Sequence, residues 1–379
     1  MTSRNAFLFP GQGSHLPGLF RDLADEHPLI GATLGVVDEV AAELGREQVS
    51  PMLLGPASAS LRELVEHDPP SLHLAVFAAS AVAFRLLTED CGVRPDVLLG
   101  HSLGELVALT AAGALTLDDG ARLVGRRDEA LRAATAPGGG LVALGCGVRR
   151  AEHLLGALGE RDVSVAADNG PGQVVLSGPD DGLRRLGESA KALGITATRL
   201  RIPYPFHNRV LAGAADDFAE RAADLPKRVP SLRVYSSSLG RYVEGATDVE
   251  LVVRGHLVRC VRFADAVRAI HADGARRFVE SGPKGVLVDL VGGIVPGVAT
   301  VAPFRRRTSR RALLSDLEEL PEPRDDGTPA AGPRPAPATS TPPRTTPARR
   351  PTPPTSGPRC SPGESSRPGS GSGPRLWPP

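Results

Sequence analysis

The stretch "LLGHSLGE" (residues 98–105) constrains the fold more than any other, because it puts a serine between two glycines where an apolar run meets a helix-like run. A Gly-x-Ser-x-Gly turn between a strand and a helix exposes the serine hydroxyl above a sheet, and the glycines permit the tight turn. The next N–H, that of Leu103, lies at a helix start, where it can point at an oxyanion. Ser102 is therefore a candidate nucleophile, with a purely structural turn as the alternative.

The surrounding pattern favours a parallel sheet with helices on both faces. Apolar strands are predicted at residues 5–9 and 96–100, with a helix over 71–87 between them and two helices following. Further strands are predicted at residues 233–238 and 276–282, with helices between them. Strand–turn–helix repeats of this kind are typical of α/β folds.

After a glycine-rich segment, the order changes to strand, helix, two strands, helix and strand over residues 141–202. This βαββαβ order is the ferredoxin-like unit. The predicted fold class is α/β, with a hydrolase-like parallel-sheet large subdomain and an inserted ferredoxin-like small subdomain. The predicted boundaries are 1–137 and 203–320 for the large subdomain, 138–202 for the small subdomain and 321–379 for a proline-rich tail.

The tail and the overall composition exclude several classes of protein. From Pro321 to Pro379, 18 of the 59 residues are proline, and so few are apolar that burial cannot offset the ordering entropy; we expect disorder there. The chain has 44 Lys and Arg against 43 Asp and Glu, so no charge imbalance points to nucleic acid or a membrane surface. The four cysteines lack metal-type spacing, which favours reduced thiols in a cytoplasmic protein.

A serine nucleophile needs a base, and the chain has nine histidines. His207 lies in "RIPYPFHNRV", a loop that follows the last strand of the predicted small subdomain and would face the cleft. His101 adjoins the serine and is expected to point away from it. His73 and His256 lie in apolar segments, where a satisfied core histidine is the expected state. From the residues alone, His207 is one candidate among several.

Two further features are weak by themselves. The loop in "FLFPGQGSH" (residues 7–15) displays one amide side chain, Gln12, but a simple glycine turn is the favoured interpretation, and the loop lacks a phosphate-binding lysine. Arg126 and Arg127 are adjacent on a predicted helix and about 100° apart, so one can face solvent while the other faces the cleft. A surface charge is the usual state of a helix arginine.

Together these segments resemble the acyl-carrier-protein S-acyltransferase family, which includes malonyl-CoA:acyl-carrier-protein transacylases of fatty acid synthesis and acyltransferase domains of polyketide synthases. The resemblance covers residues 5–305 in the family's order. The segments that carry it are "FLFPGQGS", "GHSLGE", "NGPGQVVLSGP" (169–179), "YPFH", "HLVRCVRFADAV" (256–267) and "FVESGPKGVL" (278–287).

The resemblance implies a role for each candidate residue. Ser102 would be the nucleophile and His207 the general base, with a backbone carbonyl near Arg262 orienting the imidazole in place of an aspartate. Gln12 and the Leu103 N–H would be the oxyanion donors. The implied substrate-binding residues are Arg127, which would pair with the free carboxylate of the substrate, together with Phe206 and His101.

The resemblance also implies the substrates. Malonyl-CoA would be the donor, and the phosphopantetheine thiol of an acyl carrier protein the acceptor, with no metal and no bound cofactor. Arg262, the "YPFH" motif and the tail favour a free-standing polyketide-type enzyme, while His73 stands where the family commonly has Gln. A monomer is expected. The alternatives are a serine thioesterase that clears misloaded carriers and a carrier-binding piece that is not an enzyme by itself.

Overall fold

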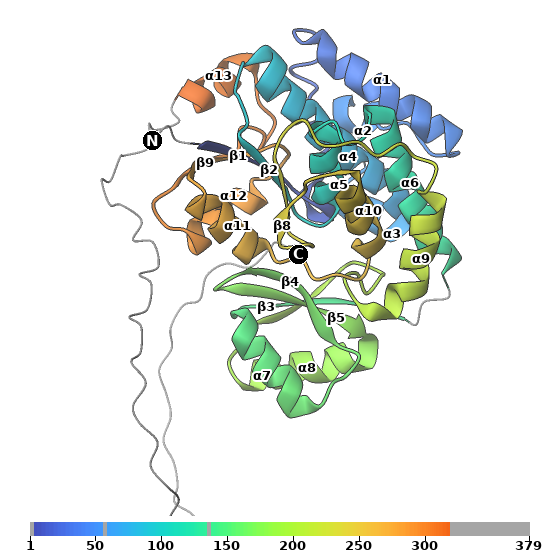
Figure 1. Ribbon diagram of the computed structural model, residues 1–379, viewed down its shortest axis with the longest axis vertical. Coiled ribbons are helices and arrows are strands. Elements are labelled where there is room, and N and C mark those ends of the chain that lie inside the picture. Colours follow the sequence, from blue (N-terminus) through green and yellow to red (C-terminus); the bar gives the residue numbers. More distant parts are fainter. Residues whose placement is uncertain (1–3, 56–58, 135–137, 319–379) are drawn as a thin grey trace, which may run out of the picture. The chain divides into compact units, whose positions relative to one another are not determined.

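The computed structural model describes residues 4–55, 59–134 and 138–318 (Figure 1). These residues belong to one compact unit that contains two sheets. The predicted tail (321–379), with Cys360, lies outside the described residues. The predicted fold class is confirmed, because one sheet is largely parallel and the other is antiparallel.

The large sheet has six strands in the order β10-β9-β1-β2-β7-β8. The pairs from β10 to β7 are parallel, and β8 returns antiparallel to β7. Strand β1 is central and buried on both faces, which explains its unbroken apolar run "AFLF". The strands are β1 (Arg4–Phe9), β2 (Val97–Gly100), β7 (Val234–Ser236), β8 (Arg241–Tyr242), β9 (Ala275–Glu280) and β10 (Ala299–Val301).

Helices flank the large sheet, and α5 contacts both β1 and β2 while α11 and α12 contact β9 (Figure 1). The helices outside the small subdomain are α1 (Pro28–Glu43), α2 (Ser50–Leu54), α3 (Leu61–His67), α4 (Pro69–Arg85), α5 (Leu103–Ala111), α6 (Leu117–Ala133), α9 (Ala212–Arg221), α10 (Ala246–Gly255), α11 (Phe263–Ala272), α12 (Val286–Ile294) and α13 (Arg310–Glu318). Short helical turns lie at Gln12–Ser14 and Arg209–Leu211, and a π-helical turn at Leu86–Asp90.

Helix α4 is the one described helix long and apolar enough to cross a membrane. With the π-helical turn after it, the apolar segment runs from Pro69 to Asp90, but 83% of its most apolar window is buried inside the protein. Asp68 caps its first turn by accepting the Ser71 N–H, and Pro69 occupies the first helical position, where its missing N–H costs nothing. The apolar run thus forms a core helix.

The small sheet has four antiparallel strands in the order β4-β5-β3-β6, which is the ferredoxin-like order. Helices α7 and α8 cover one face, and α11 and α12 contact β4. The elements are β3 (Gly139–Leu144), α7 (Val148–Leu158), β4 (Ser164–Gly170), β5 (Gln173–Pro179), α8 (Asp180–Ala192) and β6 (Ala197–Leu200). Backbone hydrogen bonds between β4 and Val261 join this subdomain to the segment before α11.

The turn from β2 into α5 leaves no room for a side chain at Gly104. A Cβ there would lie 1.9 Å from the carbonyl oxygen of Phe9, on the central strand. We expect Gly104→Ala to destabilise the protein by about 3 kcal/mol, the upper part of the usual range for overpacking, because the contact is with backbone rather than a flexible side chain. The control is Gly31→Ala in α1, where nothing lies within 4 Å and stability should rise by up to about 1 kcal/mol. Urea unfolding measures both, and equal stabilities would contradict this packing.

Candidate active site

Ser102 stands at the tip of the turn between β2 and α5. Its φ of 53° and ψ of −119° are a strained conformation for a residue with a side chain. Such strain is typical of functional turns. Oγ lies 2.8 Å from Nε2 of His207, which is 105 residues further along the chain. The structure therefore brings together the two residues that the sequence suggested as nucleophile and base.

His207 is fixed on three sides. Its backbone N–H donates to the carbonyl of Leu257 (2.7 Å), and its Nδ1 lies 2.8 Å from the carbonyl of Arg259. Because a carbonyl only accepts, Nδ1 carries the proton, and Nε2 is left as the acceptor for the hydroxyl of Ser102. The orienting carbonyl belongs to Arg259, three residues before the Arg262 that the motif suggested, because the turn before α11 brings that residue's carbonyl to the imidazole.

Burial holds the imidazole of His207 in its neutral form. Desolvation lowers the pKa of His207 to about 3, the hydrogen bond to Arg259 opposes that shift, and His101 and Arg127 lower the pKa further. The residue as a whole is only 8% exposed. A neutral imidazole next to a serine hydroxyl can take the proton as the oxygen attacks.

One of the predicted oxyanion donors, the N–H of Leu103, directly follows Ser102 in the chain. Leu103 is the first residue of α5, so its N–H has no intrahelical acceptor. The loop before Gln12 runs close to it, since a Cβ on Gly11 would lie 3.9 Å from the Leu103 nitrogen and 3.7 Å from the Ser102 Cβ. The Gln12 Nε2 is buried and has no hydrogen-bond partner within the described residues. The Leu103 N–H is therefore an unused donor next to the nucleophile, and Gln12 follows the glycine that lies close to it.

Asn169 and Asn208, which the sequence analysis did not single out, tie the site to the small subdomain. Asn169 at the end of β4 accepts through Oδ1 from Nε2 of His101 (2.7 Å). Asn208 donates through Nδ2 to the carbonyls of Ser177 (2.7 Å) and Asp162 (3.0 Å). His101 thus points at the small subdomain, and the loop that carries His207 is anchored there as well. Asn169 lies in "NGPGQ", part of a segment that carries the family resemblance, and only that resemblance could have marked it as a residue of the site.

Arg126 and Arg127 face different ways, as their helical spacing suggested. Arg126 is partly exposed and pairs with Asp224 across the surface. Arg127 is 2% exposed, its guanidinium carbon lies 4.6 Å from the centre of the Phe206 ring, and desolvation lowers its pKa. Its Nη1 donates to Asp128 (3.1 Å). The sequence analysis missed Asp128, because nothing in a helical Arg-Asp pair indicates that both side chains are buried.

The two histidines expected in the core behave differently. His73 is buried and donates from Nδ1 to Asp128 (2.8 Å). His256 is 2% exposed, and neither ring nitrogen has a partner in residues 4–55, 59–134 or 138–318. The prediction of a satisfied core histidine is therefore wrong for His256. Its ring lies 6.2 Å from that of His207, and burial lowers its pKa well below the usual value.

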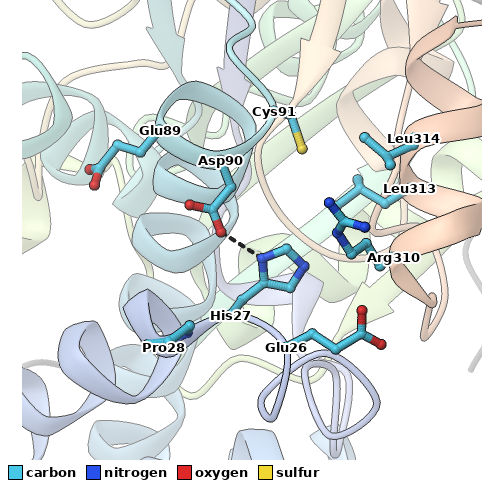
Figure 2. Close-up of a pocket in the computed structure, with 9 residues that line it drawn as sticks. All are labelled: Glu26, His27, Pro28, Glu89, Asp90, Cys91, Arg310, Leu313 and Leu314. Carbon is cyan, nitrogen blue, oxygen red and sulfur yellow. Dashed lines mark hydrogen bonds and ion pairs between the residues drawn. The ribbon is translucent and has the colours of Figure 1, made fainter.

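A cavity of about 640 Å³ is a groove separate from this site, and it shares no lining residue with it. It lies between the start of α1, the π-helical turn and α13 (Figure 2). His27 points across it to Asp90, with 2.5 Å between Nδ1 and the carboxylate. None of the candidate catalytic residues lines this groove.

A pair of serine and neutral histidine beside unused N–H donors is the arrangement that acyl transfer requires. Comparison with known proteins agrees, because the family model described as the acyl transferase domain matches residues 6–309. The chain belongs to this acyltransferase family and is an acyltransferase.

Two curated proteins illustrate what this chain is similar to. The chain is 37% identical to a spectinabilin polyketide synthase protein of Streptomyces orinoci, over 74% of this chain and 13% of that protein. It is 33% identical to mycoketide-CoA synthase of Mycobacterium tuberculosis, over 83% of this chain and 7% of that protein. The chain thus spans a small fraction of these curated relatives.

Solved structures show the same fold. The acyltransferase domain from the second module of the salinomycin polyketide synthase superposes with a TM-score of 0.71 at 32% identity, over 83% of this chain and 72% of that one. The malonyl CoA-acyl carrier protein transacylase of Coxiella burnetii superposes with a TM-score of 0.75 at 26% identity. The match covers 84% of this chain and 98% of that one. A malonyl-transacylase solved with its type II polyketide acyl-carrier protein superposes with a TM-score of 0.74 at 28% identity. The match covers 83% of this chain and 99% of that one.

Proposed function

We propose that this acyltransferase moves a malonyl or malonyl-like group from CoA to the phosphopantetheine thiol of an acyl carrier protein, through an ester on Ser102. The observation that carries the proposal is the 2.8 Å contact between Ser102 Oγ and His207 Nε2, in a turn whose next N–H is free to receive an oxyanion. The solved relative in complex with its carrier protein supports the choice of acceptor.

The first half of the reaction loads the enzyme. His207 takes the proton of Ser102 as Oγ attacks the thioester carbonyl, and the oxyanion is stabilised by the N–H of Leu103 and the amide of Gln12. When the tetrahedral intermediate collapses, the carbon–sulfur bond breaks and the CoA sulfur takes the proton from the imidazolium. CoA leaves as the thiol, and the acyl group stays on the serine.

The second half unloads it. The carrier's thiol gives its proton to His207 and attacks the ester, and the serine oxygen is reprotonated as it leaves. These side chains supply both proton transfers and the charge stabilisation, so the proposal needs no resident metal or cofactor.

We propose that Arg127, Phe206 and His101 line the site for the acyl group. The polyketide relatives favour a role in polyketide or related biosynthesis, and we propose the cytoplasm as the place and a monomer as the working form.

Intact-protein mass spectrometry tests the proposal. Mixing the full chain with malonyl-CoA should add one malonyl mass, and adding a phosphopantetheinylated carrier protein should move that mass to the carrier. Comparing carrier acylation with release of free malonate separates transfer from hydrolysis. Transfer should dominate, because burial at His207 limits the access of water. Faster release of malonate than of acyl-carrier would favour the thioesterase alternative, and an enzyme that never gains acyl mass from any acyl-CoA would overturn the proposal.

A further inference from the structure

Arg127 carries its own counter-ion. The side chains of Arg127 and Asp128 are 2% and 3% exposed, and Nη1 lies 3.1 Å from Oδ1. A buried charge is costly unless it is paired, so the carboxylate explains how this guanidinium stays inside the protein. Nη1 is already engaged by this carboxylate, whereas Nε has no partner within the described residues.

His73 holds Asp128 in that position. Its Nδ1 lies 2.8 Å from the same Oδ1, and its side chain is 2% exposed. Three atoms of this cluster have no partner in the part of the chain that the structure describes, namely Nε of Arg127, Oδ2 of Asp128 and Nε2 of His73. Buried polar atoms are seldom left unpartnered, so the cluster is a place where a ligand group or water completes the hydrogen bonds.

A donor carboxylate that reaches Arg127 therefore meets Asp128 as well. The ring of Phe206 covers one face of the guanidinium, which leaves its edge for a ligand. The carboxylates of Asp128 and of the donor, bound to the same guanidinium, would lie about 5 Å apart. At an effective dielectric constant of about 20, their repulsion weakens binding of the donor by roughly 10²-fold. A neutral acyl group of the same size meets no such repulsion.

We propose that Asp128, held by His73, is a specificity-determining residue that neutralises Arg127 and so reduces the enzyme's preference for donors with a free carboxylate. This inference rests on the proposed function, since it takes the donor's acyl group to lie against Arg127. The neutralised pocket accepts both malonyl-type donors and uncharged donors of similar size, such as propionyl-CoA.

The test compares two donors that differ by a carboxylate in place of a methyl group, malonyl-CoA and propionyl-CoA. Rapid-quench mass spectrometry gives the rate of acyl-enzyme formation with each, for the full chain. We expect Asp128→Asn to raise the malonyl-to-propionyl rate ratio by about 10- to 100-fold. The matched control is Glu129→Gln, one residue further along α6, where the side chain is about one-third exposed and pairs with Arg221; it should leave the ratio unchanged.

Because Asp128→Asn leaves a buried arginine unpaired and can impair folding, a second variant removes both charges. Replacing an ion pair as a whole is far milder than breaking it. The double variant Arg127→Ala with Asp128→Ala should keep the ratio within about fivefold of the wild type, because a neutral pair has been removed. If the double variant lowers the malonyl-to-propionyl ratio by about 30-fold or more, the effect expected for removing an unpaired arginine that binds the donor carboxylate, the inference is overturned. An unchanged or lower ratio in Asp128→Asn would overturn it as well. A wild type that is acylated by neither donor would instead refute the proposed function, and this inference with it.

Discussion

Ser102→Ala should give a folded protein that never gains acyl mass from malonyl-CoA. Within the described residues the hydroxyl of Ser102 makes one hydrogen bond, with Nε2 of His207, so its removal should leave the turn and the fold in place. The ester that the reaction needs then has no oxygen to form on. Intact-protein mass after mixing with malonyl-CoA is the measurement, and the expected effect is complete loss of acylation.

Ser237→Ala is the matched control for that experiment. Ser237 is also buried next to the turn, and its hydroxyl donates to the carbonyl of Gly100 (3.1 Å). Its loss should cost about 1 kcal/mol of stability and leave the acyl-enzyme yield unchanged. An acyl ester found on any side chain of the Ser102→Ala protein would refute the assignment of the nucleophile.

His207→Ala should slow acyl-enzyme formation by about 10²- to 10⁴-fold, the usual contribution of general-base assistance. The ring of His256 lies 6.2 Å from that of His207, but no hydrogen bond among the described residues links it to Ser102. Single-turnover rates with malonyl-CoA measure the loss. His153→Ala on the exposed face of α7 should match the wild type, and a His207→Ala rate within a few-fold of wild type would direct the search to His256.

The same histidine sets a pH dependence. Burial lowers the pKa of His207 to about 3, so the imidazole should remain a base, and kcat/KM for acylation should show no loss from its protonation until the pH approaches 4. Stability responds differently. The unfolded histidine has an ordinary pKa of about 6.5, so unfolding takes up a proton between about pH 6.5 and 3, and the His207 contribution to stability falls as the pH drops through that window. An acid limb in kcat/KM near pH 6.5 would contradict a buried neutral imidazole.

The sequence predicted the parts of the site that local pattern determines. A serine between glycines at the end of an apolar strand indicated the turn that holds Ser102, and the alternation of strands and helices indicated both sheets. The location of His207 was suggested by the crossing of the chain between subdomains. The family resemblance then supplied the roles of Gln12 and Arg127, which their own segments did not reveal.

The remaining features depend on tertiary contacts that no local pattern encodes. Asp128 looks like any acidic residue of an amphipathic helix, and its burial follows from how α6 packs against α4, which carries His73. His256 lies in an apolar segment, but whether its ring nitrogens find partners depends on side chains from distant parts of the chain. Asn208 anchors a loop to strands that precede it by more than thirty residues, and such a contact cannot be inferred from the loop alone.

The loop around His207 has a consequence for attempts to redesign this enzyme. Phe206 and His207 are neighbours in one strained turn, where His207 has a φ of 59°. The ring of Phe206 covers Arg127, and His207 is hydrogen-bonded to Ser102. Asn208 fastens the other end of the turn. In the proposed mechanism, Phe206 forms a wall against the acyl group and His207 moves the proton, and these two residues are adjacent in the chain. Enlarging the wall by exchanging this loop for a relative's would shift the base as well, so wider substrate scope would come with slower turnover unless the anchor is moved in the same exchange.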